Sequence, residues 1–254
     1  MKSEIAQLLI QLNRQFYDQF ADSFAASRPA LLPGVERLLT YVPDDSALLD
    51  VGCGHGQLAM ALHRLERRVH YVGVDASARL IEHARRLISQ LQCTHITAQF
   101  IVLDVTQPDW TNHLPHGHYQ TVALLALLHH IPGMDRRVEL LRRAASCLAP
   151  DGAMLVSTWQ FLRSERLRRR LQPWHLIGLR PEDVEPGDYL LDWQRNGRGL
   201  RYCAFIDAAA LDRLAGAAGL RIAEMFHAGQ NDLNLCAVLR PFGHRLRECL
   251  RSPD

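Results

Sequence analysis

The chain has 254 residues, a length that fits one large domain or one domain that carries a substantial insertion. Its hydrophobic fraction of 48% and its charged fraction of 22% are ordinary values for a soluble globular protein. The net charge is +2 over nearly balanced totals, so the overall charge gives no argument for nucleic-acid binding and only a local patch would support it.

Six widely scattered cysteines form no C-x-x-C pair, which indicates neither a zinc site nor a redox motif, and we expect no metal. The N-terminal stretch MKSEIAQLLIQLNRQF has polar side chains inside an apolar pattern, which favours an amphipathic helix over a secretory signal. No apolar run of the sequence is long enough to span a bilayer. We therefore expect a cytoplasmic protein with no membrane partner.

Hydrophobic spacing predicts a helix over residues 1–26 and a shorter helix over 33–41, before a turn at 43–46. From about residue 47 to residue 159, apolar strands and amphipathic helices alternate without interruption. This order demands parallel strands joined by right-handed crossovers, and hence a doubly wound α/β sheet. The predicted strands cover 47–53, 70–77, 99–106, a run from 119, and 152–159, and the helices cover 56–65, 78–91 and 134–148. The apolar stripe of the first helix comprises Ile5, Leu8, Leu9, Leu12, Phe16, Phe20 and Phe24.

The alternation stops after residue 159. Residues 161–200 are rich in arginine, with proline, glycine and tryptophan among them, and we interpret them as an insertion rather than a core element. Residues 201–254 then predict a strand, a helix and two more strands, which complete the sheet. We therefore expect a single domain over 1–254, in which residues 1–44 form an N-terminal helical lid and residues 45–160 form the core.

The segment LLDVGCGHGQLAMAL places Gly52, Gly54 and Gly56 between a strand and a helix, where backbone amides face a ligand closely. Alone, such a loop fits a phosphate, an adenosyl group or a simple turn. The dinucleotide fingerprint is G-x-G-x-x-G, and here the third glycine comes one position early. Asp50 would repel a pyrophosphate and attract an ammonium group, so the pattern favours a cationic ligand that carries an amino acid.

Two further acids follow the next two strands. Asp75 ends the second strand, where a carboxylate suits bidentate hydrogen bonding to ribose hydroxyls. Asp104 follows the third strand, where its carboxylate suits an exocyclic amine while the amide of Val105 meets a ring nitrogen. The alternative for each acid alone is a cap at a strand end. Together with the glycine loop, the three acids predict one crevice at the carboxyl ends of adjacent strands.

The successive segments LDVGCGHG, VGVDAS, VLDVT, LLALLHHI and LAPDGAMLVSTW resemble the motifs of class I S-adenosylmethionine-dependent methyltransferases in order and spacing. The resemblance implies a Rossmann-like methyltransferase fold with a mostly parallel seven-stranded sheet, in which 45–160 bind the cofactor and 161–200 lie on the substrate side. It also implies S-adenosylmethionine as the cofactor and S-adenosylhomocysteine as the product. The implied cofactor-binding residues are Tyr17, Arg28, Asp50, Gly52, Cys53, Gly54, Asp75, Ala76, Asp104, Val105 and Leu125.

The flanking segments YDQFADSFAASRPALLPGVERLL, LLHHIPGMDRRVELL, GDYLLDW and RYCAF resemble the tRNA wobble-uridine carboxymethyl methyltransferases, which methylate a carboxylate. The chain departs from that family's pattern at Leu32, at Cys203 and Ala204 in the R-Y-Y-H stretch, and at Leu235. The resemblance implies a tRNA partner, and a small activating partner protein of the kind that some members of the family need.

Methyl transfer is an in-line displacement, in which the protein mainly aligns the reacting groups. His129 and His130 follow the fourth strand, where a histidine acts as a base or as a hydrogen-bond donor to the substrate; the alternative is packing and capping. Arg28 suits a carboxylate of the cofactor or of the substrate, and the alternative is a surface arginine on the lid. Tyr17 would cover the cofactor or pack in the core. The candidate catalytic residues are therefore His129, His130 and Arg28.

A basic run in the insertion offers a local patch for nucleic acid. Phosphate contacts and base stacking need clustered arginines beside an aromatic ring, although a solvated helix face is the usual explanation of such a run. The run comprises Arg163, Arg166, Arg168, Arg169 and Arg170, followed by Trp174.

Three functions therefore compete. The first is a methyltransferase that acts on a tRNA wobble-uridine carboxymethyl group, and the second is a methyltransferase for the oxygen or nitrogen of a small molecule. The third is a binding module that keeps the fold without catalysis. A basic face continuous with the pocket would favour tRNA, a closed apolar pocket would favour the small molecule, and the three intact acids argue against the binding module.

Overall fold

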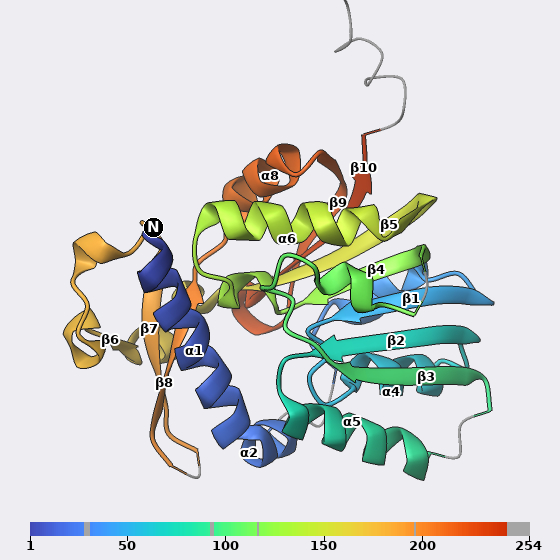
Figure 1. The fold of residues 1–254 in the computed structure, drawn as a ribbon, viewed down its shortest axis with the longest axis horizontal. Coiled ribbons are helices and arrows are strands. Elements are labelled where there is room, and N and C mark those ends of the chain that lie inside the picture. Colours follow the sequence, from blue (N-terminus) through green and yellow to red (C-terminus); the bar gives the residue numbers. More distant parts are fainter. Residues whose placement is uncertain (28–30, 92–93, 116, 196, 243–254) are drawn as a thin grey trace, which may run out of the picture.

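The computed structural model describes residues 1–27, 31–91, 94–115, 117–195 and 197–242. Its centre is a seven-stranded sheet with the order β3 (Ile96–Val102), β2 (Val69–Asp75), β1 (Ser46–Val51), β4 (Tyr119–Leu125), β5 (Leu148–Trp159), β10 (Asn234–Pro241), β9 (Leu220–Ala228) (Figure 1). All neighbouring pairs are parallel except the two that β10 makes, with β5 and with β9. The predicted doubly wound, mostly parallel fold is confirmed.

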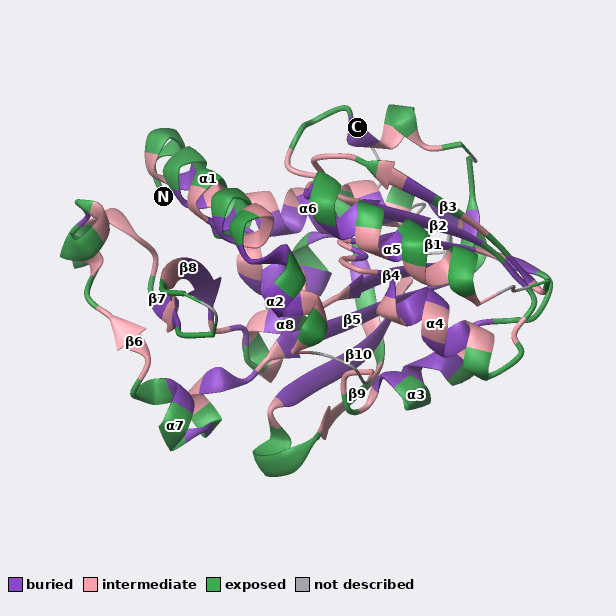
Figure 2. Cartoon of the chain, turned by 90° about the horizontal axis from the view of Figure 1, so that it is seen from below, coloured by how far each residue is buried: buried purple, intermediate pink, exposed green. Residues whose placement is uncertain are grey.

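Helices cover both faces of this sheet. One face packs against α1 (Ser3–Gln19), α6 (Met134–Ser146) and α8 (Ala208–Ala217). The other face packs against α3 (Val35–Leu38), α4 (Gln57–Arg64) and α5 (Ala78–Gln90). Figure 2 shows the strands as a mainly buried layer, while the outer sides of the helices are exposed. The short helices α2 (Ala21–Ala26) and α7 (Glu165–Arg168) lie outside these two layers.

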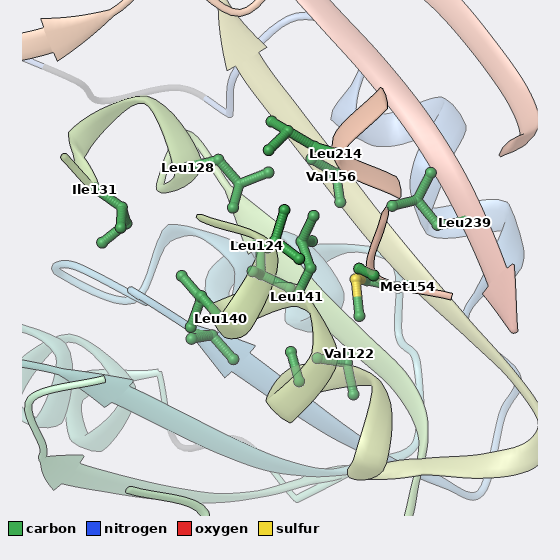
Figure 3. Close-up of a cluster of buried hydrophobic side chains, with 14 of the residues drawn as sticks. Val122, Leu124, Leu128, Ile131, Leu140, Leu141, Met154, Val156, Leu214 and Leu239 are labelled. Atoms are coloured by element: carbon green, nitrogen blue, oxygen red, sulfur yellow. The ribbon is translucent and has the colours of Figure 1, made fainter. Parts of the chain in front are cut away.

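The strands are apolar on both sides because both sides are covered. On β1, Leu49 belongs to the cluster under α1, α6 and α8, whereas its neighbour Leu48 belongs to the cluster under α3, α4 and α5. Figure 3 shows the first cluster, in which Leu124 of β4 and Leu141 of α6 lie among the labelled side chains. The parallel pairing of β1 to β5 brings the carboxyl ends of these strands to one edge of the sheet.

A second, antiparallel sheet lies in and beyond the insertion. It consists of β6 (Leu171–Gln172), β7 (Asp188–Trp193) and β8 (Gly199–Ala204). The strand that the sequence predicts over RYCAF is present as β8, but it does not complete the main sheet as expected. Alternating apolar residues predict a strand without stating which sheet it joins, so this assignment was wrong.

Two smaller expectations also need correction. The strand expected over 152–159 begins earlier, at Leu148, so residues 149–151 belong to β5, which pairs with β4 through an irregularity between Tyr119 and Thr121. On the first helix Leu8 is exposed, while Leu9 and Phe16 are buried. The helix ends at Gln19 and a short helix follows, so the stripe continues through Phe20 into α2.

Helix α1 joins the two sheets through one buried side chain. Its Asn13 accepts a hydrogen bond from the amide of Tyr202 on β8, at 2.8 Å, and donates to the Tyr202 carbonyl at 3.2 Å. The side-chain amide of Asn13 also donates to the carbonyl of His130, at 3.2 Å. In Figure 1, α1 accordingly lies between the small sheet and the main sheet.

Among the helices of the described chain, none has the length and apolar character needed to cross a membrane.

Removal of a buried side chain from the first cluster tests this packing. Leu141 is fully buried on α6, so Leu141→Ala should lower the free energy of unfolding by about 2–5 kcal/mol through lost burial and cavity formation. Urea denaturation followed by circular dichroism measures this change. Leu65 is 50% exposed, and Leu65→Ala should cost less than about 0.5 kcal/mol. Equal costs for the two substitutions would contradict the packing described here.

Candidate active site

A cavity of about 190 Å³ lies where β1, β2 and β4 end, and residues of α1 and α2 also line it. It brings together residues that are far apart in the chain. Arg28 falls outside the described residues, and His129 does not line the cavity. The predicted site residues that line it are Tyr17, Asp50, Gly52, Cys53, Gly54, Asp75, Ala76, Asp104, Val105, Leu125 and His130.

The glycine loop turns sharply after β1. Gly52, Gly54 and Gly56 all have positive φ, at +77°, +55° and +84°. A Cβ atom on Gly52 would lie 2.9 Å from Cδ1 of Leu127, so this position excludes any side chain. The amide of Gly52 donates to the Val74 carbonyl at 2.8 Å, which ties the loop to β2. The positive φ of Gly52 and its close contact with Leu127 thus explain why the loop has a glycine at this position.

Asp50 lies at the floor of the cavity, 3% exposed. Its carboxylate accepts a hydrogen bond of 2.5 Å from the hydroxyl of Tyr71 on β2. Burial raises the pKa of Asp50 to about 7, and the neighbouring charge of Asp75 adds to the shift, while the Tyr71 hydrogen bond opposes it. Among the described residues, no cation forms a salt bridge with Asp50. A buried carboxylate without a cationic partner fits the ammonium group of an amino acid.

Asp75 holds the glycine loop against the start of α5. Its two oxygens accept hydrogen bonds from the amides of Gly54, at 3.0 Å, and Ser77, at 2.9 Å. Burial raises the pKa of Asp75, and the two amides oppose that rise. The carboxylate also lines the cavity. Capping and ligand contact are therefore compatible at this residue, because each carboxylate oxygen has two lone pairs.

Asp104, like Asp75, both caps a backbone turn and lines the cavity. One of its oxygens accepts hydrogen bonds from the amide of Thr106, at 2.9 Å, and from the Thr106 hydroxyl, at 2.6 Å. Both Asp104 and Val105 line the cavity. Asp104 lies two residues beyond the end of β3, in the turn that these bonds stabilise. The turn fixes the carboxylate at the cavity, and its contact with an adenine amine stays a prediction.

Tyr17 and His130 form a hydrogen-bonded pair on the wall of the cavity. The Nδ1 atom of His130 lies 3.2 Å from the carbonyl oxygen of Tyr202, which only accepts, so Nδ1 carries the proton. In the neutral ring, Nε2 then accepts from the Tyr17 hydroxyl at 2.7 Å. The backbone thus selects the tautomer and turns the basic nitrogen of His130 toward Tyr17.

His129 lies behind this pair, 2% exposed. Its Nδ1 accepts a hydrogen bond from the amide of Trp159 at 3.3 Å. The ligand atoms of His129, His130 and Cys203 lie within 4.8 Å of one another, a cluster that the sequence does not predict because Cys203 comes from the small sheet. Both ring nitrogens of His130 already form hydrogen bonds, one with Tyr17 and one with Tyr202. We therefore interpret the cluster as a hydrogen-bonded group and not as a metal site.

Other residues of the family resemblance lie elsewhere. Arg137 and Tyr202 form a buried network with Asp188, whose carboxylate accepts from the Tyr202 hydroxyl at 2.6 Å and lies 3.1 Å from Arg137. Arg136 donates to Ser3 on the surface. None of these residues lines the cavity.

The sequence missed three contributors to the site. Asn13 lines the cavity and fixes both His130 and Tyr202, and its only sequence signal is a polar residue inside an apolar stripe. Tyr71 is buried under Asp50, and nothing distinguishes it from an ordinary strand residue. Ala126 lines the cavity with a φ of +54°, held by hydrogen bonds from its amide to Ser157. Such strained backbone collects at functional sites.

The profile of a family described as "Methyltransferase domain" matches residues 23–225. A tRNA (carboxymethyluridine(34)-5-O)-methyltransferase of Mus musculus, ALKBH8, is 25% identical over 146 residues, which are 57% of this chain and 19% of the mouse protein. A ubiquinone biosynthesis O-methyltransferase of Xanthomonas campestris is 31% identical over 113 residues, which are 44% of this chain and 42% of that protein. The chain therefore spans about a fifth of one relative and less than half of the other.

Among solved structures, a SAM-dependent methyltransferase from Methanosarcina mazei has a TM-score of 0.65 and 18% identity, over 85% of this chain and 100% of that one. This likeness concerns the fold.

The raised pKa of Asp50 predicts a pH dependence of S-adenosylmethionine binding. An ammonium group favours the ionised acid, so binding at pH values below about 7 must release the proton of Asp50. Affinity should therefore rise by up to about tenfold per pH unit from pH 5.5 to 7 and then level off. Calorimetry in two buffers of different ionisation enthalpy measures the released proton. Asp50→Asn should bind more weakly with a flat profile, and a flat wild-type profile would disprove the assignment.

Asp75→Ala tests the ribose contact. The substitution removes a charged acceptor of two hydroxyl groups and frees the Gly54 amide, so the affinity for S-adenosylmethionine should fall at least about tenfold. Calorimetric titration measures it, with Asp151→Ala as the control because Asp151 is exposed and does not line the cavity. An unchanged affinity in Asp75→Ala would mean that the ribose lies elsewhere.

Proposed function

Because the chain belongs to the methyltransferase-domain family and its methyl donor is S-adenosylmethionine, we propose that it methylates the carboxylate of a carboxymethyl group on a tRNA wobble uridine. The observation that carries this proposal is the polarity of the cavity wall beside α1. Its polar side chains there are Asn13, Arg14, Tyr17 and His130, which are neutral or cationic. Within the described lining, the only carboxylates are the three acids of the cofactor end. Such a wall suits an anionic acceptor.

The residues of the cofactor end have distinct roles in this proposal. When bound, S-adenosylmethionine supplies a sulfonium methyl group that a nucleophile can attack in line. Asp50 holds the ammonium group and Asp75 holds the ribose hydroxyls. Asp104 and the amide of Val105 hold the adenine. Since these carboxylates are fixed by Tyr71, by Gly54 and Ser77, and by Thr106, the methyl direction is set before the acceptor arrives.

The Tyr17–His130 pair orients the acceptor. A carboxylate is already anionic and loses no proton during methylation, so it needs no general base. The Tyr17 hydroxyl donates its single proton to Nε2 of His130 at 2.7 Å, so in this proposal it turns away from the histidine to donate to an acceptor oxygen. His129 supports its neighbour from behind and is not a catalytic residue in this proposal. Arg28 keeps its expected role toward a carboxylate as a prediction, because it lies outside the described residues.

A small-molecule acceptor is the second candidate, and the apolar part of the cavity lining supports it. Most of the lining is apolar, with Ile10, Leu127 and Ile131 beside the Tyr17–His130 pair. None of the five arginines of the basic run lines the cavity, and Arg163 lies 3.1 Å from Asp232 in a salt bridge. The Xanthomonas campestris relative is a ubiquinone biosynthesis O-methyltransferase. For a hydroxyl acceptor, the Tyr17–His130 pair would receive the proton.

The non-catalytic binding module is the third candidate, and the three acids argue against it because a scaffold does not need all of them. A cytoplasmic location and a small activating partner protein stay predictions.

Transfer of a labelled methyl group separates the three functions. Total RNA and a small-metabolite extract are prepared from cells that lack this gene, and each is incubated with the protein and S-adenosylmethionine labelled in the methyl group. We expect label in RNA that mild alkali releases, since a methyl ester is hydrolysed under those conditions and an N-methyl group is not. Asp75→Ala, incubated in parallel, should lose the label.

The remaining outcomes identify the alternatives. Label in the metabolite extract alone would replace the tRNA proposal with the small-molecule one. Absence of label from both extracts, combined with calorimetric binding of S-adenosylmethionine, would support the binding module.

A further inference from the structure

Arg201 on β8 is buried without a counter-charge. Arg201 is 4% exposed, and its Nε and Nη1 atoms have no hydrogen-bond partner. Among the residues that the structure describes, no carboxylate forms a salt bridge with it, whereas the buried Arg137 lies 3.1 Å from Asp188. A guanidinium cannot shed its charge, so burial without a partner is costly. Arg201 is therefore a buried cation without a carboxylate partner, whereas the buried Arg137 has one.

Three aromatic rings surround this guanidinium. The Cζ atom of Arg201 lies 5.0 Å from the ring centroid of Trp159, 5.4 Å from Phe16 and 5.7 Å from Trp193. Ring faces stabilise a cation partly, but they do not satisfy its N–H groups. The aromatic cage, defined by these three rings, thus holds the charge in place and leaves donor groups for a ligand.

The aromatic cage adjoins the acceptor side of the cavity. Phe16 lies 5.2 Å, ring to ring, from Tyr17, and Trp193 lies 6.5 Å from Phe24; both Tyr17 and Phe24 line the cavity. Side chains two residues apart on a strand share a face, so Arg201 and Cys203 point the same way from β8. The Sγ atom of Cys203 lies within 4.8 Å of a ring nitrogen of His130, which also lines the cavity. Arg201 itself does not line the cavity and its Nε and Nη1 atoms are closed to solvent, so it lies behind the cavity wall, on the face of β8 that also carries Cys203.

From this geometry we infer that Arg201 binds the carboxylate of the methyl acceptor and selects acidic acceptors over neutral ones. Guanidinium N–H groups form charge-assisted hydrogen bonds with carboxylate oxygens, and the Nε and Nη1 atoms of Arg201 each have a donor without a partner. The ligand supplies the counter-charge that the fold omits. This inference rests on the proposed carboxylate acceptor, but it holds for a tRNA carboxymethyl group and for a small organic acid alike.

Binding of a simple acid tests Arg201 without any methyl transfer. Phenylacetate is the probe, and phenylacetamide, which has the same shape and no charge, is the matched neutral compound. Because two of the four tryptophans flank Arg201, tryptophan fluorescence reports occupancy. We expect phenylacetate to bind the wild type at least tenfold more tightly than phenylacetamide. Arg201→Met should lose this preference, Arg201→Lys should keep part of it, and Arg221→Met, an exposed control on β9, should behave as the wild type.

Thermal unfolding separates a binding role from a structural one. If Arg201 serves the ligand, Arg201→Met should unfold at the same temperature as the wild type or higher, because the variant removes an uncompensated buried charge. Arg201→Gln, which is neutral and polar, replaces it if Arg201→Met does not fold. Equal binding of the acid and the amide to the wild type would overturn the inference. So would a neutral variant that keeps the acid preference but melts at a lower temperature.

If acid selection at Arg201 is found but RNA is not labelled, the anion site stands and the tRNA acceptor fails. If RNA is labelled in alkali-labile form while phenylacetate shows no preference, the proposed function stands and the role of Arg201 fails. The two proposals are therefore tested separately.

Discussion

The hydrogen bonds of Asp75 are the interaction on which the cofactor end of the site depends. Asp75 ends β2, yet its carboxylate binds the amide of Gly54 in the loop after β1 and the amide of Ser77 at the start of α5. One side chain thus joins two neighbouring strand ends and fixes the helix that follows. The parallel register places Asp50 opposite Gly73, so the acids of both strands reach the same cavity. The position of the loop is therefore a property of the sheet as much as of the glycines.

Asn13 has the corresponding role on the acceptor side. Its side-chain amide joins helix α1 to the turn that carries His130 and to strand β8, both of which are more than a hundred residues away from Asn13 in the chain. The Tyr202 carbonyl accepts from Asn13 and also from Nδ1 of His130, so one backbone oxygen contacts both helix α1 and the ring of the histidine and selects the tautomer of that ring. Since Tyr17 lies one helical turn beyond Asn13, helix α1 and the Tyr17–His130 pair are fixed together.

The sequence predicts features that short segments and topology determine together. The glycine loop and the acids at strand ends are local patterns, and parallel pairing brings their strand ends to one edge, so the cavity contains most of the predicted residues. Two kinds of information are absent from such patterns. Adjacent residues in a tight turn face different directions, and for this reason His130 lines the cavity while His129 is buried behind it. Strand patterns also do not state which sheet a strand joins, so the strand over RYCAF was predicted but its place in the small sheet and the cage around Arg201 were not.

The two ends of the site treat a buried charge differently. At the cofactor end Asp50 lacks a cationic partner among the described residues, and burial raises its pKa to about 7, so this acid can take up a proton near neutral pH. A guanidinium does not have this option at any physiological pH. Arg201 instead has three aromatic rings that stabilise the cation without neutralising it. Because a structural arginine in the same chain, Arg137, is paired with Asp188, the unpaired one is the more specific sign of a ligand. The free-energy cost of a buried, unpaired charge is thus largest at Arg201, where the charge stabilises no other part of the fold.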